Sequence, residues 1–92
     1  MDKQQIIDLM ASRGYCIYAD SGQPIIFFRH LTWTDLSVKV DLNSGEIQFI
    51  FLIQMGTMLT VTSQWLNVED TSIFRQYQAA MIRAAINLGV EK

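Results

Sequence analysis

Apolar and polar side chains alternate most clearly between Glu46 and Trp65, and positions 47 to 68 carry no charge. An apolar side chain at every second position lies on one face of an extended strand, and most of the types found here favour strands. These side chains are Ile47, Phe49, Phe51, Ile53 and Met55. A second alternating run follows Gly56. The stretch therefore predicts a β-hairpin that turns at Gly56 and forms the central piece of a small sheet.

The turn at Gly56 decides which residues of the hairpin face each other. A three-residue loop with Gly56 in the left-handed conformation pairs Ile53 with Thr57. A two-residue turn at Gly56 and Thr57 instead pairs Met55 with Met58 and spreads the large apolar side chains over both faces. Burial of one large apolar side chain contributes about 1.5–3 kcal/mol, so we expect the first register, which gathers these side chains on one face. The predicted core face holds Phe49, Phe51, Ile53, Leu59, Val61 and Trp65.

Three segments upstream of the hairpin also have the pattern of strands. Tyr15–Ala19 and Ile25–His30 flank a turn cluster at positions 20 to 24, and together they predict a first hairpin. Thr34–Leu42 alternates between apolar and polar side chains, as expected when one side of a strand meets solvent. All connections are too short for the crossovers that parallel strands require. We therefore expect five strands in an antiparallel meander.

A short amphipathic helix is predicted at the start of the chain. Asp2 can cap it, and Gln5 has the spacing of a capping box. The helix covers about Asp2–Arg13 and ends at Gly14. Its inward stripe comprises Ile6, Leu9, Met10 and Arg13. Because the helix is short, we expect it to be stabilised by packing against the sheet rather than by its own propensity.

After Trp65 the period of the apolar positions changes from two to about 3.6 residues, which predicts a C-terminal helix. Asp70 or Thr71 can cap this helix, and Gly89 ends it. Its apolar stripe comprises Phe74, Tyr77, Met81, Ala84, Ala85 and Leu88. Each helix has a single stripe to bury, so both should cover the same face of the sheet. The sequence thus predicts a single α+β domain over residues 1–92, in the order helix, five strands, helix.

Composition narrows the classes of function. Half of the 92 residues are hydrophobic and 17% are charged, below the share of about a quarter that is usual in proteins. The surface should therefore carry apolar area or be covered by another chain. A formal charge of −2 and a sequence pI near 5.1 argue against nucleic-acid binding, which needs clustered lysine and arginine.

The chain has the features expected of a soluble cytoplasmic protein. Its single cysteine, Cys16, cannot form an internal disulfide, which fits a reducing compartment. The N-terminal residues lack the long apolar core of a signal peptide. The uncharged stretch is interrupted by Gln48, Gln54 and Gly56, which suits a hairpin better than a membrane helix of about twenty apolar residues. We expect no contact with a membrane.

The residues that could carry chemistry form no catalytic, cofactor-binding or metal-binding signature. His30 is the only histidine, and Cys16, Asp20 and Asp35 are the candidates for acid–base or thiol chemistry beside it. Their spacing is not diagnostic of any site. We expect His30 to be a structural residue at a strand end and Cys16 to be a small, half-buried filler. One histidine and one cysteine are too few for a zinc site, and the glycines are too scattered for a phosphate loop.

The remaining feature is an outward-facing apolar set. The hairpin leaves Ile50 and Leu52 off the core face, and one ring of the adjacent pair Phe27 and Phe28 must point outward. A contiguous patch on the sheet of a protein with so little charge favours association. The predicted partner-binding residues are Ile50, Leu52, Phe28, Trp33 and Met58. We expect a non-enzymatic protein–protein interaction module, homodimeric, that acts as an adaptor or as an inhibitor of the kind that phages and mobile elements direct against host proteins.

The alternative function is small-molecule binding. A concave sheet and a helix can enclose a pocket that is mostly apolar and has a few polar groups. His30, Tyr18 or Tyr77 would supply this polarity between the sheet and the C-terminal helix. The protein would then be a ligand sensor or a minor enzyme.

Overall fold

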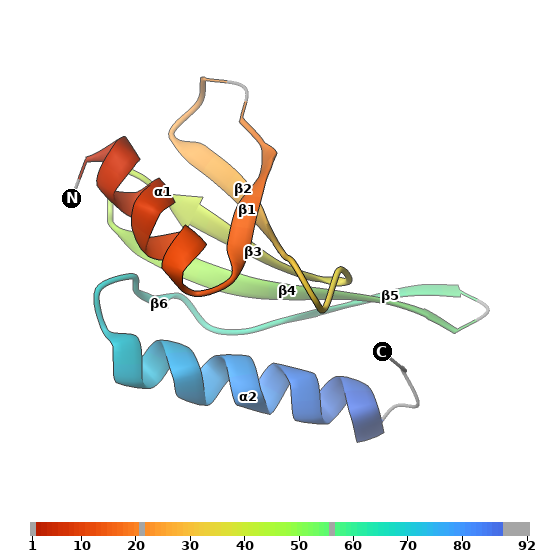
Figure 1. Ribbon diagram of the computed structural model, residues 1–92. Coiled ribbons are helices and arrows are strands. Elements are labelled where there is room, and N and C mark those ends of the chain that lie inside the picture. The colour runs from red at the N-terminus through yellow and green to blue at the C-terminus, as the bar shows by residue number, and fades with distance from the viewer. Residues whose placement is uncertain (1, 21, 56, 88–92) are drawn as a thin grey trace.

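The computed structural model describes residues 2–20, 22–55 and 57–87, and for positions 53–55 and 57–59 it describes the backbone only. Along these residues two helices flank a run of strands (Figure 1). The elements are α1 (Lys3–Ser12), β1 (Tyr15–Ala19), β2 (Ile25–His30), β3 (Leu36–Asp41), β4 (Glu46–Met55), β5 (Thr57–Thr62), β6 (Leu66–Asn67) and α2 (Thr71–Asn87). The predicted α+β fold, with a helix before and after an antiparallel sheet, is confirmed.

The sheet is an antiparallel meander, as predicted. Its strands lie in the order β1-β2-β3-β4-β5, so neighbours in the sheet are also neighbours in the chain. The sequence pattern does not predict the two-residue strand β6, which pairs with the beginning of β4 and sets Ile47 opposite Leu66. Strand β4 therefore has β3 on one side and both β5 and β6 on the other (Figure 1). It is the strand through which β5 and β6 join the rest of the sheet.

The pairing of β4 with β5 differs from both registers that the sequence suggests. Ile53 lies opposite Leu59, whereas the favoured register pairs it with Thr57. The difference is a shift of two residues, and such a shift keeps every side chain on its own face of the sheet. Phe51 is accordingly buried, as predicted, although its partner is a different one. The conformation expected of Gly56 lies outside the described residues.

Both helices pack against the same face of the sheet, as predicted. Ile6 and Met10 of α1 and Phe74 of α2 belong to one buried cluster with the inward side chains of the strands. The ring of Phe74 lies 4.9 Å from that of Phe49, measured between centroids. The buried side chains of the strands are Tyr15, Ile26, Phe28, Leu36, Val38, Val40, Ile47, Phe49, Phe51 and Leu66.

The helix caps follow the sequence. The Asp2 carboxylate accepts the Gln5 N–H at 2.8 Å, and the Gln5 side chain accepts the Asp2 N–H at 2.8 Å, so the capping box is confirmed. Asp70, one of the two residues expected to cap α2, accepts the Ile73 N–H at 3.0 Å. The other, Thr71, is the first residue of the helix.

The apolar stripe of α2 is narrower than predicted. Met81 and Ala85 are buried, but Ala84 is exposed. Successive residues of a helix are rotated by about 100°, so Ala84 lies to one side of the buried stripe that contains Ala85. Leu88, the last residue of the predicted stripe, and the predicted helix end at Gly89 lie outside the described residues.

Trp65 is not part of the core, contrary to the prediction. Its side chain is 41% exposed, whereas Leu66 and Val68 are 7% and 1% exposed. The reason lies at Ser63, where the chain leaves β5: its hydroxyl accepts the Phe49 N–H at 2.9 Å and its own N–H donates to the Phe49 carbonyl at 3.0 Å. This link between β5 and β6 interrupts the alternation, so Leu66 turns to the core and Trp65 turns away from it.

Candidate functional site

The face of the sheet opposite the helices carries the side chains that alternate with the core residues. The register sets Ser37 opposite Ile50 and places Lys39 between Phe27 and Gln48. We call this surface the outer face. Its residues include Cys16, Tyr18, Phe27, Arg29, Ser37, Lys39, Asp41, Glu46, Gln48, Ile50, Leu52 and Trp65. Both helices pack on the other side of the sheet.

Two of the predicted partner-binding residues lie on the outer face. Leu52 is 43% exposed and Ile50 is half-buried. Phe28 is 0% exposed, so its assignment to a partner surface is wrong. It lies opposite Val38 on the core face, and Phe27 takes the outward position. The sequence alone cannot distinguish two adjacent phenylalanines, because only the pairing with β3 decides which of them faces the helices.

Trp33 lies in the connection between β2 and β3. Its side chain is half-buried and packs against the hydrophobic core. The backbone N–H of Trp33 donates to His30 Nδ1 at 2.9 Å, and its backbone carbonyl accepts the Leu36 N–H at 2.8 Å. These contacts give Trp33 a structural role in the connection. The side chain of Met58, also predicted to bind a partner, lies outside the described residues.

The outer face is not the continuous apolar patch that the sequence predicts, because charged side chains interrupt it. The guanidinium of Arg29 lies 4.0 Å from the ring centroid of Tyr18, and Lys39 Nζ lies 5.5 Å from that of Trp65. The face of an aromatic ring attracts a cation within about 6 Å of its centroid. Tyr18 and Trp65 are 57% and 41% exposed. The outer face thus combines exposed rings, cations and separate aliphatic side chains.

Strand β1 exposes more of its side chains than its apolar composition predicts. Tyr15 is buried, but the rest of the strand is exposed. The strand lies at the edge of the sheet, and its pairing with β2 shifts between Ile17 and Ala19. Cys16, expected to be half-buried, is therefore exposed opposite Arg29.

His30 lies at the end of β2, the strand end where the sequence places it, and its side chain contacts the connection that follows. Its Nδ1 accepts the N–H groups of Thr32 and Trp33 at 3.1 and 2.9 Å. Its ring meets that of Tyr15 edge to face, with the centroids 4.9 Å apart. Burial lowers the pKa of His30, because the charged imidazolium loses hydration. The neutral side chain therefore holds the connection that follows the strand.

The residues that would supply polarity to a small-molecule pocket do not converge. His30 holds the connection after β2, and Tyr18 lies on the outer face. The Tyr77 hydroxyl lies 3.5 Å from Gln64 Oε1, between α2 and the segment before β6. The structure gives no support to a pocket built from these three side chains.

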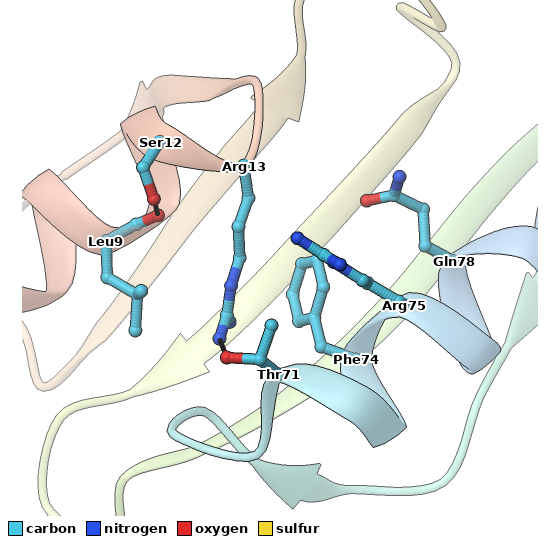
Figure 2. A pocket seen from close by; sticks show the side chains of 7 residues that line it. All are labelled: Leu9, Ser12, Arg13, Thr71, Phe74, Arg75 and Gln78. Atoms are coloured by element: carbon cyan, nitrogen blue, oxygen red, sulfur yellow. Dashed lines mark hydrogen bonds between the residues drawn. The ribbon is translucent and has the colours of Figure 1, made fainter.

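A pocket that the sequence does not predict lies between the end of α1 and the first turns of α2 (Figure 2). Its volume is about 330 Å³. We call it the interhelical pocket. It is lined by Leu9, Ser12, Arg13, Thr71, Phe74, Arg75 and Gln78. One sequence signal points to it in retrospect, since α2 contains two arginines and no acidic residue over Thr71–Asn87.

Arg13 crosses from the end of α1 to the start of α2. Its Nη1 donates to the Val68 carbonyl at 2.8 Å, and its Nη2 donates to the Thr71 hydroxyl at 3.2 Å. The guanidinium lies 4.2 Å from the ring centroid of Phe74. Burial, followed by the positive charge of Arg75, lowers the pKa of Arg13. The side chain thus holds the two helix ends together while its charge stays partly desolvated.

Tyr15 fixes the side chain of Gln78 at the same pocket. Its hydroxyl donates to Gln78 Oε1 at 3.0 Å. Burial raises the pKa of Tyr15, so the phenol keeps the proton that it donates. The bond occupies the Gln78 carbonyl and leaves the amide NH₂ as a donor.

Within residues 2–20, 22–55 and 57–87, no group of three or more His, Cys, Asp or Glu side chains is arranged to hold a metal ion. Neither of the two described helices has the length and apolar character needed to cross a membrane. Comparison of the chain with protein-family models, with curated proteins and with solved structures gives no match.

Proposed function

We propose that the protein is a non-enzymatic interaction module that forms a homodimer through its outer face. The observation that carries the proposal is the set of exposed aromatic rings and cations on this face. Tryptophan, tyrosine and arginine are the residue types that contribute most binding energy at protein interfaces. Tyr18, Arg29 and Trp65 bring all three types onto one surface.

The outer face can be covered without disturbing the fold. The inward side of the sheet and the apolar stripes of both helices already form one core. Leu52, Tyr18 and Trp65 remain between 41% and 57% exposed on the other side. Removal of apolar surface from water contributes about 25 cal/mol per Å², so a partner placed here would gain stability from side chains that the monomer leaves in solvent.

Charge favours a second copy of the chain as the partner. A two-fold dimer places the same surface on both sides of the interface, so this surface must complement itself. The outer face carries Arg29 and Lys39 along its strands and a carboxylate pair, Asp41 opposite Glu46, at one end of β3 and β4. A copy rotated by the two-fold axis can set its carboxylates against the cations of the first, which fixes the orientation of the pair.

The dimer would work by covering a surface of another protein with a part of the molecule that the outer-face contact leaves free, such as the edge strand β1. Apolar burial flanked by polar groups needs no bond-making step. The module would serve as an adaptor, or as an inhibitor of the kind that phages and mobile elements direct against host proteins. The exposed thiol of Cys16 suits a reducing compartment, so we place this work in the cytoplasm.

Leu52→Lys tests the homodimer. In sedimentation velocity experiments, the wild-type chain should move from monomer to dimer as its concentration rises through the micromolar range. Leu52→Lys should weaken dimerisation by about tenfold or more, because it places an unpaired charge within the interface. The matched control is Ile86→Lys, which changes an aliphatic side chain that is 54% exposed on α2. The control should dimerise like the wild type.

Two results would contradict the proposal. A wild-type chain that stays monomeric at every concentration would exclude the homodimer. Equal weakening by Leu52→Lys and Ile86→Lys would show that the outer face has no special role. Both side chains are exposed, so both variants should keep the far-ultraviolet circular dichroism of the wild type.

A further inference from the structure

We infer that the interhelical pocket binds an oxyanion, either a phosphate or a carboxylate group, between Arg13 and Arg75. The inference is independent of the homodimer, because the pocket is lined by α1 and α2 on the helical side of the molecule (Figure 2).

The positive charge at the pocket has no carboxylate partner in the part of the chain that the structure describes. Of these residues, two arginines line the pocket and no acidic side chain does. Among the described residues the one ion pair joins Lys3 to Asp20 at 2.7 Å, and neither side chain lines the pocket. Arg13 donates to the Val68 carbonyl and the Thr71 hydroxyl, which are both neutral. These two hydrogen bonds position the Arg13 side chain, but neither acceptor carries a negative charge that would compensate the guanidinium.

The two arginines also repel each other. Figure 2 shows the Arg75 side chain extending from α2 toward Arg13. After burial, the charge of Arg75 is the second cause that lowers the pKa of Arg13. An anion between two cations replaces this repulsion by attraction, and the attraction is stronger where protein excludes part of the water. The free protein therefore gains most from a ligand that carries negative charge.

The pocket offers donors that suit oxygen atoms. Arg13 Nε has no acceptor among the described residues, but it is itself buried, so it does not count among the donors that a ligand can reach. The Gln78 carbonyl is occupied by the Tyr15 hydroxyl, which leaves the amide NH₂ to donate. Planar guanidinium groups bind the oxygens of carboxylate and phosphate in pairs. A group with two or more negatively charged oxygens matches this set of donors, and a cation does not.

The dimensions suit a small group. A volume of about 330 Å³ lies near the lower end of the range of about 300–1,000 Å³ that is typical of ligand pockets. Leu9 and Phe74 supply apolar walls beside the arginines. Inorganic phosphate and the carboxylate end of an acidic side chain present the same chemistry to such a site.

Titration of the ¹⁵N-labelled chain with inorganic phosphate, followed by the arginine Nε–Hε resonances at constant ionic strength, tests the site. The resonances of Arg13 and Arg75 should shift and saturate together. Arg75→Gln should weaken phosphate binding by about tenfold or more, because it removes a charge-assisted contact. The matched control is Arg83→Gln, an arginine on the same helix that does not line the interhelical pocket, and it should bind like the wild type.

Thermal unfolding separates a binding role of Arg75 from a structural one. Phosphate should raise the melting temperature of the wild type, because a ligand that binds the folded state stabilises it. Arg75→Gln should abolish this rise. Without phosphate, Arg75→Gln should melt at the same temperature or higher, because the change removes a repulsion from Arg13. Arg13→Gln is less informative, since Arg13 also holds Val68 and packs on Phe74.

A parallel titration with acetate identifies the source of the group. Tighter binding of phosphate assigns the site to phosphate ligands, and equal or tighter binding of acetate assigns it to carboxylates, such as acidic side chains of a peptide. Shifts that do not saturate with either anion would overturn the inference. So would equal effects of Arg75→Gln and Arg83→Gln.

Discussion

His30 links the stability of the fold to pH, and we predict that stability falls as the pH drops below the ordinary histidine pKa of about 6.5. Burial lowers the pKa of His30 in the folded chain, so the unfolded chain binds more protons between that lowered value and 6.5. The stability that the neutral His30 side chain contributes is fully present above pH 6.5, and it is lost as the pH falls from 6.5 through the lowered pKa. Protonation at Nδ1 would also remove the acceptor for Thr32 and Trp33.

Urea unfolding at pH 7.5 and at pH 5.5 measures this dependence. The matched variant is His30→Asn, whose side-chain oxygen can accept a hydrogen bond near the position of Nδ1 and does not titrate in this range. The variant should lose less stability than the wild type between the two pH values, since His30 is the only histidine of the chain. Equal losses in the two proteins would contradict the role given to His30.

Alternation along a strand shows which side chains share a face, but it does not show which face is the core. In β2 this leaves Phe27 and Phe28 equivalent until β3 pairs with them. The exposure of Trp65 could not be predicted from the alternation for another reason. The hydroxyl of Ser63 takes the place of a strand residue beside Phe49 and reverses the alternation that follows. A serine in the sequence gives no sign that its side chain will act in this way.

At the scale of elements, the capping box makes α1 depend on one carboxylate. We predict that Asp2→Ala lowers the free energy of unfolding by about 0.5–2 kcal/mol, the usual cost of losing an N-cap. The reason is that the Gln5 N–H loses its acceptor at 2.8 Å. Urea unfolding followed by circular dichroism measures the change.

The control for this prediction is Asp8→Ala in the same helix. Asp8 accepts a hydrogen bond from the Gln4 side chain at the surface, at 2.9 Å, and caps nothing. We expect its loss to change stability by no more than about 0.5 kcal/mol, as for other surface residues. A loss as large as that of Asp2→Ala would show that the cap is not the cause.

The main elements and their order in the sheet were largely predictable, whereas the register of β4 with β5 and the short strand β6 were not. Capping residues and the change of period from two to 3.6 locate both helices. The register of β4 and β5 was wrong by two residues, because a shift of two keeps the same side chains buried and leaves the hydrophobic pattern satisfied. Strand β6 has two residues and is too short for any period to appear.

At the scale of the whole molecule, Phe74 joins α2 to the rest of the core. Its ring lies 4.9 Å from that of Phe49 and 5.8 Å from that of Tyr15, between centroids. We predict that Phe74→Ala lowers the free energy of unfolding by about 3–5 kcal/mol, the usual cost of removing a buried phenylalanine. Ile86→Ala on the exposed side of α2 should cost no more than about 0.5 kcal/mol.

The two probes of this experiment should agree. Far-ultraviolet circular dichroism reports the helices, and the fluorescence of Trp33 and Trp65 reports the sheet and its connections. Because helices and strands share one buried cluster, urea should unfold them in a single transition in both proteins. Separate transitions, with the helical signal lost first, would contradict a common core.

The common face of the two helices was predictable from their single stripes, but the interhelical pocket was not. Arg13 and Arg75 are far apart in the chain and line the same pocket only because α1 and α2 both pack on one face of the sheet. No local pattern contains this information. The α2 sequence shows only that its two arginines have no acidic neighbour within the helix.

Ser63 also determines how the sheet could grow. On the side of β4 opposite β3, β6 pairs with Glu46 and Ile47, Ser63 bonds the backbone of Phe49, and the pairing with β5 runs from Ile50 to Met55, so this side of β4 is occupied along its length. The longer outer strands of the sheet are then β5 on this side and β1 at the opposite edge, and an outer strand is where a strand from another molecule can add. The shift in the pairing of β1 between Ile17 and Ala19 disfavours a regular ladder there. Any edge-to-edge polymerisation of this protein would therefore start at β5.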